Sequence, residues 1–342
     1  MNSPERVQTA LRRGQPDRVP IVEFVIDPKV AEAAVPGCVD TSDCKDRLGM
    51  DSVGCGVQFD AVEEHADGTY VDEWGVTYRR NPEVVAHPVR GPIETMADLR
   101  RYQPPDPDAP HRLGELADVV RRYKGERAII FHQRAAFMWS AYLNGLDNLL
   151  ANFLLEPALA EALLDMVLEV HLAVARRAVR AGAEVIVLGD DYAHNTGPMM
   201  SPDAFDHLIL PRLTRMVDVI HEEGALVIKH SDGYMYPLLE SIAASGADAV
   251  NPIEPAAGMD LATTKRLVGD RMALVGNVDC GQLLSHGTTD DVRNAVRQCI
   301  LDGGPGGGYL LSSSNSIHSS VKPENLVAMV EAGLEYGTYP LA

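Results

Sequence analysis

The sequence lacks the features that would place the protein in a membrane, outside the cell or on a nucleic acid. No apolar run reaches the roughly 18 residues of a membrane span. The opening MNSPERVQTALRRGQPDRVP carries charges where a signal peptide would be apolar. Basic residues are scarce, with 30 Lys and Arg against 49 Asp and Glu and a net charge of −19. Such a surface repels phosphate backbones and anionic lipids, so we expect no nucleic-acid or membrane partner.

Paired cysteines are also missing. The five cysteines are odd in number and widely spread, and none forms a C-x-x-C pair. This usage suits a reducing compartment, so we expect a cytoplasmic protein whose cysteines are core or loop residues. The chain also lacks the G-x-G-x-x-G turn that opens many doubly wound sheets.

What the sequence does contain is an alternation of short apolar runs with helical patterns. The runs are continuous, as expected of parallel strands covered on both faces. The predicted strands are Val19–Glu23, Ser52–Val57, Ala128–His132, Val185–Leu188, Leu226–Lys229, Ala249–Ile253, Ala273–Val275 and Tyr309–Ser312. The clearest predicted helices, with apolar residues near a period of 3.6, are Pro157–Ala181, Pro202–Glu223, Leu261–Val268, Thr289–Leu301 and Pro323–Tyr336.

Eight strands alternating with helices predict an α/β protein with a (β/α)8 TIM barrel. A doubly wound open sheet is the alternative, but it usually has fewer strands and a glycine-rich first turn. We expect one domain, residues 1–342, with an insertion at about residues 58–125 between the second and third strands. Trp74–Arg80 within the insertion is predicted to form a small hairpin.

Polar residues follow nearly every predicted strand, at the end where barrel enzymes carry their chemistry. One such residue is an ordinary turn cap, but the whole set predicts a polar pocket. In GDDYAHN two carboxylates are adjacent, and we expect one to face the pocket and the other a helix or loop. The set comprises Glu23, Gln58, Gln133, Arg134, Asp190, Asp191, His230, Asp232, Asn251, Glu254, Asn277, Asp279, Asn315 and His318.

Several blocks resemble the uroporphyrinogen decarboxylase superfamily, in the order in which that family has them. They are SPERVQTALRRGQPDRVP, GDDYAHNTGPMMSPDAFDHLILP, HSDG, GNVD and KPENLVAMVEA. The resemblance spans nearly the whole chain and implies the same barrel. It does not extend to the arginine-rich block with which the haem-pathway decarboxylase holds substrate carboxylates, because the chain has PIVEFVIDP there, with Glu23. It is closer to the corrinoid-linked methyltransferases.

That branch and the related methionine synthases bind zinc through His-x-Cys after the fifth strand, a Cys at the eighth and, in the synthases, a Glu at the sixth. The corresponding residues here are His230, Asp232, Asn315 and Glu254. Oxygen donors have replaced both sulfurs, which would make a harder site that polarises oxygen. The resemblance thus implies a zinc site of His230, Asp232 and Glu254, and a metal-free acid–base cluster stays open as the alternative.

The resemblance implies an enzyme that moves a methyl group between a small molecule, most simply an O-methyl compound, and a corrinoid (cobalamin). The corrinoid would be free or carried by a partner protein, because the chain has no D-x-H-x-x-G signature of its own. A homodimer is compatible with the sequence. The alternatives are a decarboxylase or lyase for a small acid, with Arg134 as carboxylate anchor, and a non-catalytic corrinoid or small-molecule binding protein.

These roles distribute the polar residues as follows. The catalytic candidates are His230, Asp232, Glu254 and Asp191. The corrinoid-facing candidates are Asn277, Asp279 and Asn315. The substrate candidates are Glu23, Gln133, Arg134 and His318.

Overall fold

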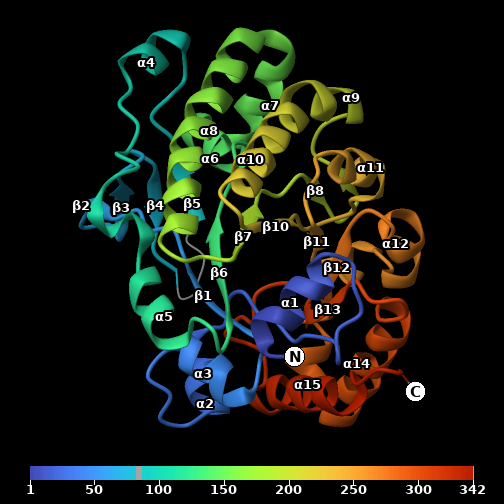
Figure 1. The fold of residues 1–342 in the computed structure, drawn as a ribbon. Coiled ribbons are helices and arrows are strands. Elements are labelled where there is room, and N and C mark those ends of the chain that lie inside the picture. The colour runs from blue at the N-terminus through green and yellow to red at the C-terminus, as the bar shows by residue number, and fades with distance from the viewer. Residues whose placement is uncertain (82–86, 342) are drawn as a thin grey trace.

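A computed structural model describes residues 1–81 and 87–341. Seven parallel strands form one curled sheet in the order β1-β6-β7-β10-β11-β12-β13. Their bounds are β1 Ser52–Gly56, β6 Ala128–Gln133, β7 Val185–Gly189, β10 Leu226–His230, β11 Ala249–Asn251, β12 Ala273–Val278 and β13 Tyr309–Ser313. Helices surround the sheet, and the predicted TIM-barrel architecture is confirmed (Figure 1).

The eighth side of the barrel is the segment predicted as the first strand, residues 19–23. It forms an isolated parallel bridge between Ile21 and Leu311 and not a regular strand. The amide of Asp51 also donates to the Ile21 carbonyl at 2.8 Å, so the segment contacts both sheet edges. Pro20 has no N–H to contribute, which explains why the ladder stays short. The expected strand is therefore corrected to a bridging segment that closes the barrel.

The outer helices match the predicted pattern closely. The helices α12 (Leu261–Val268) and α15 (Pro323–Tyr336) have the predicted bounds, and α8 covers Pro157–Arg180. The predicted helix 202–223 is divided into α9 (Pro202–Ala204), a π-helical turn (Phe205–Ile209) and α10 (Leu210–Glu222). The other main helices are α1 Ser3–Leu11, α2 Pro28–Ala34, α3 Thr41–Leu48, α6 Phe137–Asn144, α7 Leu146–Leu155, α11 Tyr236–Ala244 and α14 Thr289–Gly303. Among the described residues, no helix combines the length and apolar character of a membrane crossing.

The barrel interior is a separate apolar core, and its pattern sets the site. Alternate residues of the strands point inward, including Ile130 of β6, Val187 of β7 and Ile228 of β10. Val7 and Leu11 of α1 pack against the same core. The outward-facing residues pack under the helices in a second, larger core. Two residues beyond the last inner core residue of a strand, the same alternation brings the next inward-facing residue to the carboxyl end of the barrel.

The insertion between β1 and β6 contains an antiparallel sheet of β2 (Ala61–Glu64), β3 (Thr69–Asp72), β4 (Thr77–Arg79) and β5 (His87–Arg90), followed by α4 (Met96–Arg101) and α5 (Leu116–Tyr123). The predicted hairpin exists as β3 and β4, but Trp74 lies in its turn and not in a strand. Buried Arg112 braces the insertion from within by donating to Glu73 at 2.5 Å and to the carbonyl of Gln58, which follows β1, at 2.6 Å.

Candidate active site

A cavity of about 680 Å³ opens at the carboxyl end of the barrel. Its wall continues the inward-facing positions of the strands, so the same period of two that builds the core also selects the site. The inward-facing strand residues on the wall include Gly54, His132, His230, Asn251 and Ser312. A volume of this size suits a small organic ligand.

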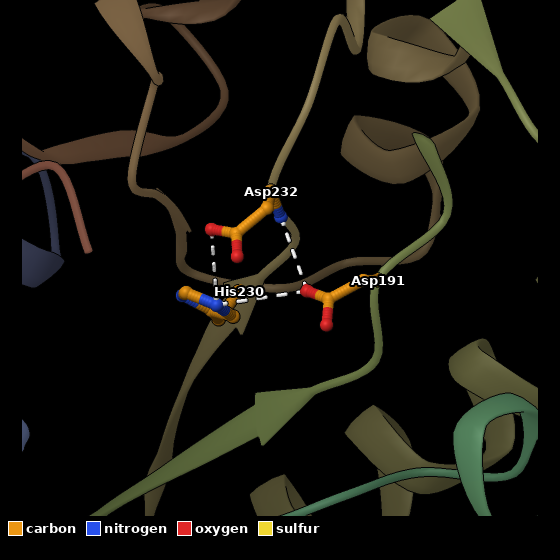
Figure 2. A group of neighbouring side chains, drawn as sticks. All are labelled: Asp191, His230 and Asp232. Atoms are coloured by element: carbon orange, nitrogen blue, oxygen red, sulfur yellow. Dashed lines mark hydrogen bonds and ion pairs between the residues drawn. The ribbon is translucent and has the colours of Figure 1, made fainter. Parts of the chain in front are cut away.

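One side of the cavity carries an imidazole between two carboxylates. His230 Nε2 lies 3.4 Å from Asp232 Oδ1 and 3.6 Å from Asp191 Oδ1 (Figure 2). The amide of Asp232 donates to the same Asp191 oxygen at 3.1 Å. Ladder pairing sets this geometry, because His230 is in register with Gly189 of β7 and Asn251 of β11.

Asn251 determines which imidazole nitrogen faces the carboxylates. Its Nδ2 donates to the Val275 carbonyl at 3.1 Å, so its Oδ1 is the atom that lies 2.6 Å from His230 Nδ1. An amide oxygen only accepts, so Nδ1 must carry a proton. Nε2 therefore presents either a lone pair or a second proton to Asp191 and Asp232.

The cluster is short of positive charge. Asp232 Oδ2 accepts from Asn315 Nδ2 at 2.7 Å, but Asp232 Oδ1 is buried and has no hydrogen-bond donor. Burial, reinforced by the nearby charge of Asp191, raises the pKa of Asp232. A buried acceptor without a partner is costly, and a cation between it and Nε2 would satisfy it. Single ligand atoms of Asp191, His230 and Asp232 lie within 4.8 Å of one another, which suits a metal ion.

A lysine inside β10 holds the two loops that carry this cluster. Lys229 is fully buried, and its Nζ donates to the carbonyls of Asp190 (2.7 Å), Leu188 (3.3 Å) and His230. The ammonium lies 4.1 Å from the ring centroid of Tyr192, and burial lowers its pKa to about 8. The sequence prediction gave Lys229 no role, although a charged residue in an apolar run is a recognisable signal.

The adjacent carboxylates of GDDYAHN separate as expected. Asp190 is fully buried and accepts from the amides of Phe137 (2.8 Å) and Met138 (3.3 Å) at the start of α6. A carboxylate there satisfies free amides of the first helical turn. Asp191 lies on the cavity wall.

Glu254, predicted as a metal ligand, lies outside the metal-sized cluster. Its Oε2 accepts from the Gly233 amide at 2.8 Å, and burial raises its pKa. Gly233 has φ +92°, and a Cβ there would lie 2.6 Å from the Ala193 backbone, so the turn requires glycine. Glu254 therefore supports the HSDG turn, and the cluster that is compact enough for a metal ion contains Asp191 in place of Glu254.

The other predicted residues divide between the cavity wall and the structure around it. Glu23, Gln133, Arg134 and Asn315 are on the wall. Arg134 Nη1 donates to the Gly189 carbonyl and lies 3.8 Å from Asp191 Oδ2, while Gln133 Nε2 donates to the His171 carbonyl at 3.0 Å.

Asn277, Asp279 and His318 do not contribute to the wall. Asn277 Nδ2 donates to the Ile253 carbonyl at 2.9 Å, and Asp279 accepts from the amides of its own turn. His318 Nδ1 accepts from Ser320 at 3.3 Å. The structure thus gives these three residues local roles in place of a direct position in the cavity.

His132 is a wall residue that the sequence prediction missed. It lies at the end of β6, and its ring contacts that of Phe24 edge to face at 5.6 Å. Burial lowers its pKa to about 3, so the ring is neutral near pH 7. Ile130 could have indicated this position, because residues two apart on a strand face the same side and Ile130 faces the barrel interior.

Comparison with known proteins places the chain in a family. A model of the uroporphyrinogen decarboxylase (URO-D) family matches residues 70–336, which is most of the chain. The chain belongs to the URO-D family. The resemblance drawn from the sequence blocks is thereby confirmed at family level.

Relatives in the URO-D family are distant. A uroporphyrinogen decarboxylase of Alkalilimnicola ehrlichii is 29% identical over 285 residues, covering 77% of this chain and 73% of the relative. That of Pseudoalteromonas translucida is 26% identical over 267 residues, covering 72% and 70%. Among solved structures, a methyltransferase from Methanosarcina mazei superposes with a TM-score of 0.77 and 19% identity, covering 98% of this chain and 99% of that one. This last similarity establishes the shared fold.

Proposed function

We propose that this URO-D family member is a methyltransferase that takes a methyl group from a small O-methyl compound and passes it to a corrinoid on a partner protein. The observation that supports this most is the cluster of Asp191, His230 and Asp232 on the wall of a small-molecule cavity. Its carboxylates would attract a cation, either a proton on His230 or a metal ion, to the point where an ether oxygen would leave.

The charge of the cavity favours this reading over decarboxylation of a polycarboxylate. Three carboxylates, those of Glu23, Asp191 and Asp232, contribute to the wall, and the side chain of Arg134 is already engaged by Gly189 and Asp191. A substrate with many carboxylates would be repelled. The named decarboxylases are distant relatives, and the similarity to the Methanosarcina methyltransferase adds only that the fold supports the proposed class.

The residues of the chain supply leaving-group activation. With Nδ1 held by Asn251, a protonated Nε2 of His230 would donate to the ether oxygen, and Asp191 and Asp232 would stabilise the imidazolium. An electron pair of the nucleophile would form a new bond to the methyl carbon as the methyl carbon–oxygen bond breaks. The electron pair of the broken bond would stay on the oxygen, which would take the proton from Nε2.

A divalent metal such as zinc fits the same residues. One imidazole nitrogen and two carboxylate oxygens are suitable donors, and the orphaned Asp232 Oδ1 would gain a partner. A bound metal would supply Lewis-acid polarisation of the oxygen. A reduced corrinoid would supply the nucleophile, and the small volume of the cavity indicates that it would approach from the barrel mouth on its partner protein.

The test is methyl transfer from a panel of methyl ethers to free reduced cobalamin. The absorbance change of the cobalamin measures the transfer. We expect transfer by the wild type and a loss of roughly 100-fold or more in His230→Ala. His286→Ala, which removes an exposed imidazole at the end of a short helix, serves as the matched control and should retain the rate. Release of carbon dioxide from a small acid, with no methyl transfer from any ether, would favour the decarboxylase alternative.

A further inference from the structure

The side of the cavity opposite His230 carries a second polar group, Glu23. Around the barrel the order is segment 19–23, β1, β6, β7, β10, so β10 is the fourth strand from the segment that carries Glu23. In an eight-sided barrel, four positions apart means opposite sides. Glu23 is only 3% exposed and is one of the residues that line the cavity.

Glu23 has an acceptor position to spare. Its Oε1 accepts from the Ser313 amide and from Ser312 Oγ at 3.3 Å, and its Oε2 lies 3.0 Å from Ser313 Oγ. A carboxylate offers about four acceptor positions. The single Ser313 hydroxyl proton can also go to the Asn315 carbonyl, so at most three hydrogen bonds are made and at least one position is left at Oε2. The nearby buried cation Lys45 directs its Nζ to the Phe24 carbonyl at 2.8 Å and is not part of the wall.

The wall next to Glu23 is aromatic, because the ring of the following residue, Phe24, contacts the ring of His132. His132 presents a neutral imidazole, and the rings of Phe24, Phe59 and Trp139 contribute to the wall. A carboxylate placed at this end would face the Glu23 carboxylate, whereas a hydrogen-bond donor would complete its acceptor set. The chemistry of this end is thus opposite to that of a site for acids.

We infer that Glu23, positioned by Ser312 and Ser313, binds a hydrogen-bond donor of the substrate, a hydroxyl or ammonium group, at the end of the molecule away from the methyl group. The inference rests on the proposed function for the identity of the methyl end. It extends that function by naming the substrate class as a methyl ether with a second, donating polar group.

A purely structural role for Glu23 would be to fasten segment 19–23 to β13. That role predicts a change in stability when Glu23 is altered, but no preference among ligands. The two roles therefore separate in a binding experiment.

The probes are four aromatic ethers of similar size, measured by titration calorimetry above pH 7 with no corrinoid present. They are para-methoxyphenol, para-methoxybenzylammonium, para-dimethoxybenzene and para-methoxybenzoate. We expect wild-type protein to bind the phenol or the ammonium at least roughly tenfold more tightly than the dimethoxy compound, as a hydrogen bond to a charged group implies. The benzoate should be the weakest. The tighter of the two donors identifies the group.

In Glu23→Gln, which keeps an acceptor oxygen but no charge, the preference should fall to about threefold or less. Asp279→Asn alters a strand-exit carboxylate away from the wall and should keep the wild-type preference. Equal binding of donor and dimethoxy probes, tightest binding of the benzoate, an unchanged preference in Glu23→Gln, or no binding of any probe would each overturn the inference. If Glu23→Gln does not fold, the wild-type ratios still decide.

Because these measurements need no turnover, the two proposals fail separately. A donor preference without methyl transfer in the cobalamin assay would refute the proposed function and leave the Glu23 site standing. Methyl transfer without a donor preference would refute the Glu23 site alone.

Discussion

Replacing Glu23 by Gln should make the protein's stability less dependent on pH. Burial raises the pKa of Glu23 from 4.5 to about 7, against the hydrogen bonds from Ser312 and Ser313 and the charge of Lys45. A carboxyl group whose pKa is higher in the folded than in the unfolded state binds protons more tightly when folded. Its stabilising contribution is therefore complete below about pH 4.5 and is lost as the pH rises through about 7.

The magnitude follows from the size of the shift. A change from 4.5 to about 7 corresponds to roughly 3 kcal/mol at about 1.4 kcal/mol per pKa unit. Because Glu23 is 3% exposed, solvent screening does not reduce this figure much. The free energy of unfolding of Glu23→Gln relative to wild type should thus rise by about 3 kcal/mol between about pH 4.5 and about pH 8.

Urea titrations of both proteins across this pH range measure the difference directly. Glu240→Gln is the matched control, because Glu240 is exposed and the Arg271 guanidinium lowers its pKa below the range. Its difference from wild type should stay flat. A flat difference for Glu23→Gln as well would refute the buried, proton-binding carboxyl described above.

Three further predictions concern the His230 side of the cavity. Metal analysis after zinc loading should find less bound metal in Asp191→Asn than in Glu254→Gln, since only Asp191 belongs to the ligand cluster; the reverse order would restore Glu254 as the ligand. Asn251→Leu should lower methyl-transfer activity roughly 10- to 100-fold, and nitrogen NMR should show the signal of the hydrogen-bonded Nδ1–H of His230 shift or disappear; an unchanged spectrum would contradict the hydrogen bond from Nδ1–H to Asn251. Lys229→Met leaves buried carbonyls without a donor and should cost roughly 2–4 kcal/mol of unfolding free energy in a urea titration; unchanged stability would refute its bracing role.

The fold could be predicted from the sequence because the strand patterns and the helix patterns both pointed to the same architecture. Continuous apolar runs indicated strands buried on both faces, and α12 and α15 began and ended where their apolar periods did. Two of the differences from the predicted elements have local causes. Pro20 cannot donate to a ladder, which leaves residues 19–23 as a bridge. A π-helical turn at Phe205–Ile209 interrupts a helix whose apolar period does not reveal it.

The site was only partly predictable, because the paths of the loops after the strands determine which side chains meet there. His230 and Asn251 lie side by side on adjacent strands, and this pairing can be predicted from the sequence once the register of the strands is known. Asp191 and Glu254 both lie beyond their strands, where the path of the turn determines which carboxylate meets His230. His132 and Lys229 were missed for a different reason: each is the last residue of a predicted strand, where it reads as part of the buried apolar run.

The fixed tautomer of His230 leads to one more prediction. With Nδ1–H bound to Asn251, a neutral His230 would place a lone pair against two carboxylate oxygens, giving three acceptors and no donor. Such an arrangement is unstable in a partly buried site, so the cluster should hold a proton, shared between Nε2 and the two carboxylates, whenever it holds no metal. Metal binding must then displace that proton. Calorimetric titration with zinc in buffers of different ionisation enthalpy should show proton release that depends on His230 and is absent in His230→Ala. Binding without proton release would mean that Nε2 was already unprotonated, and the acid role proposed for His230 would have to be abandoned.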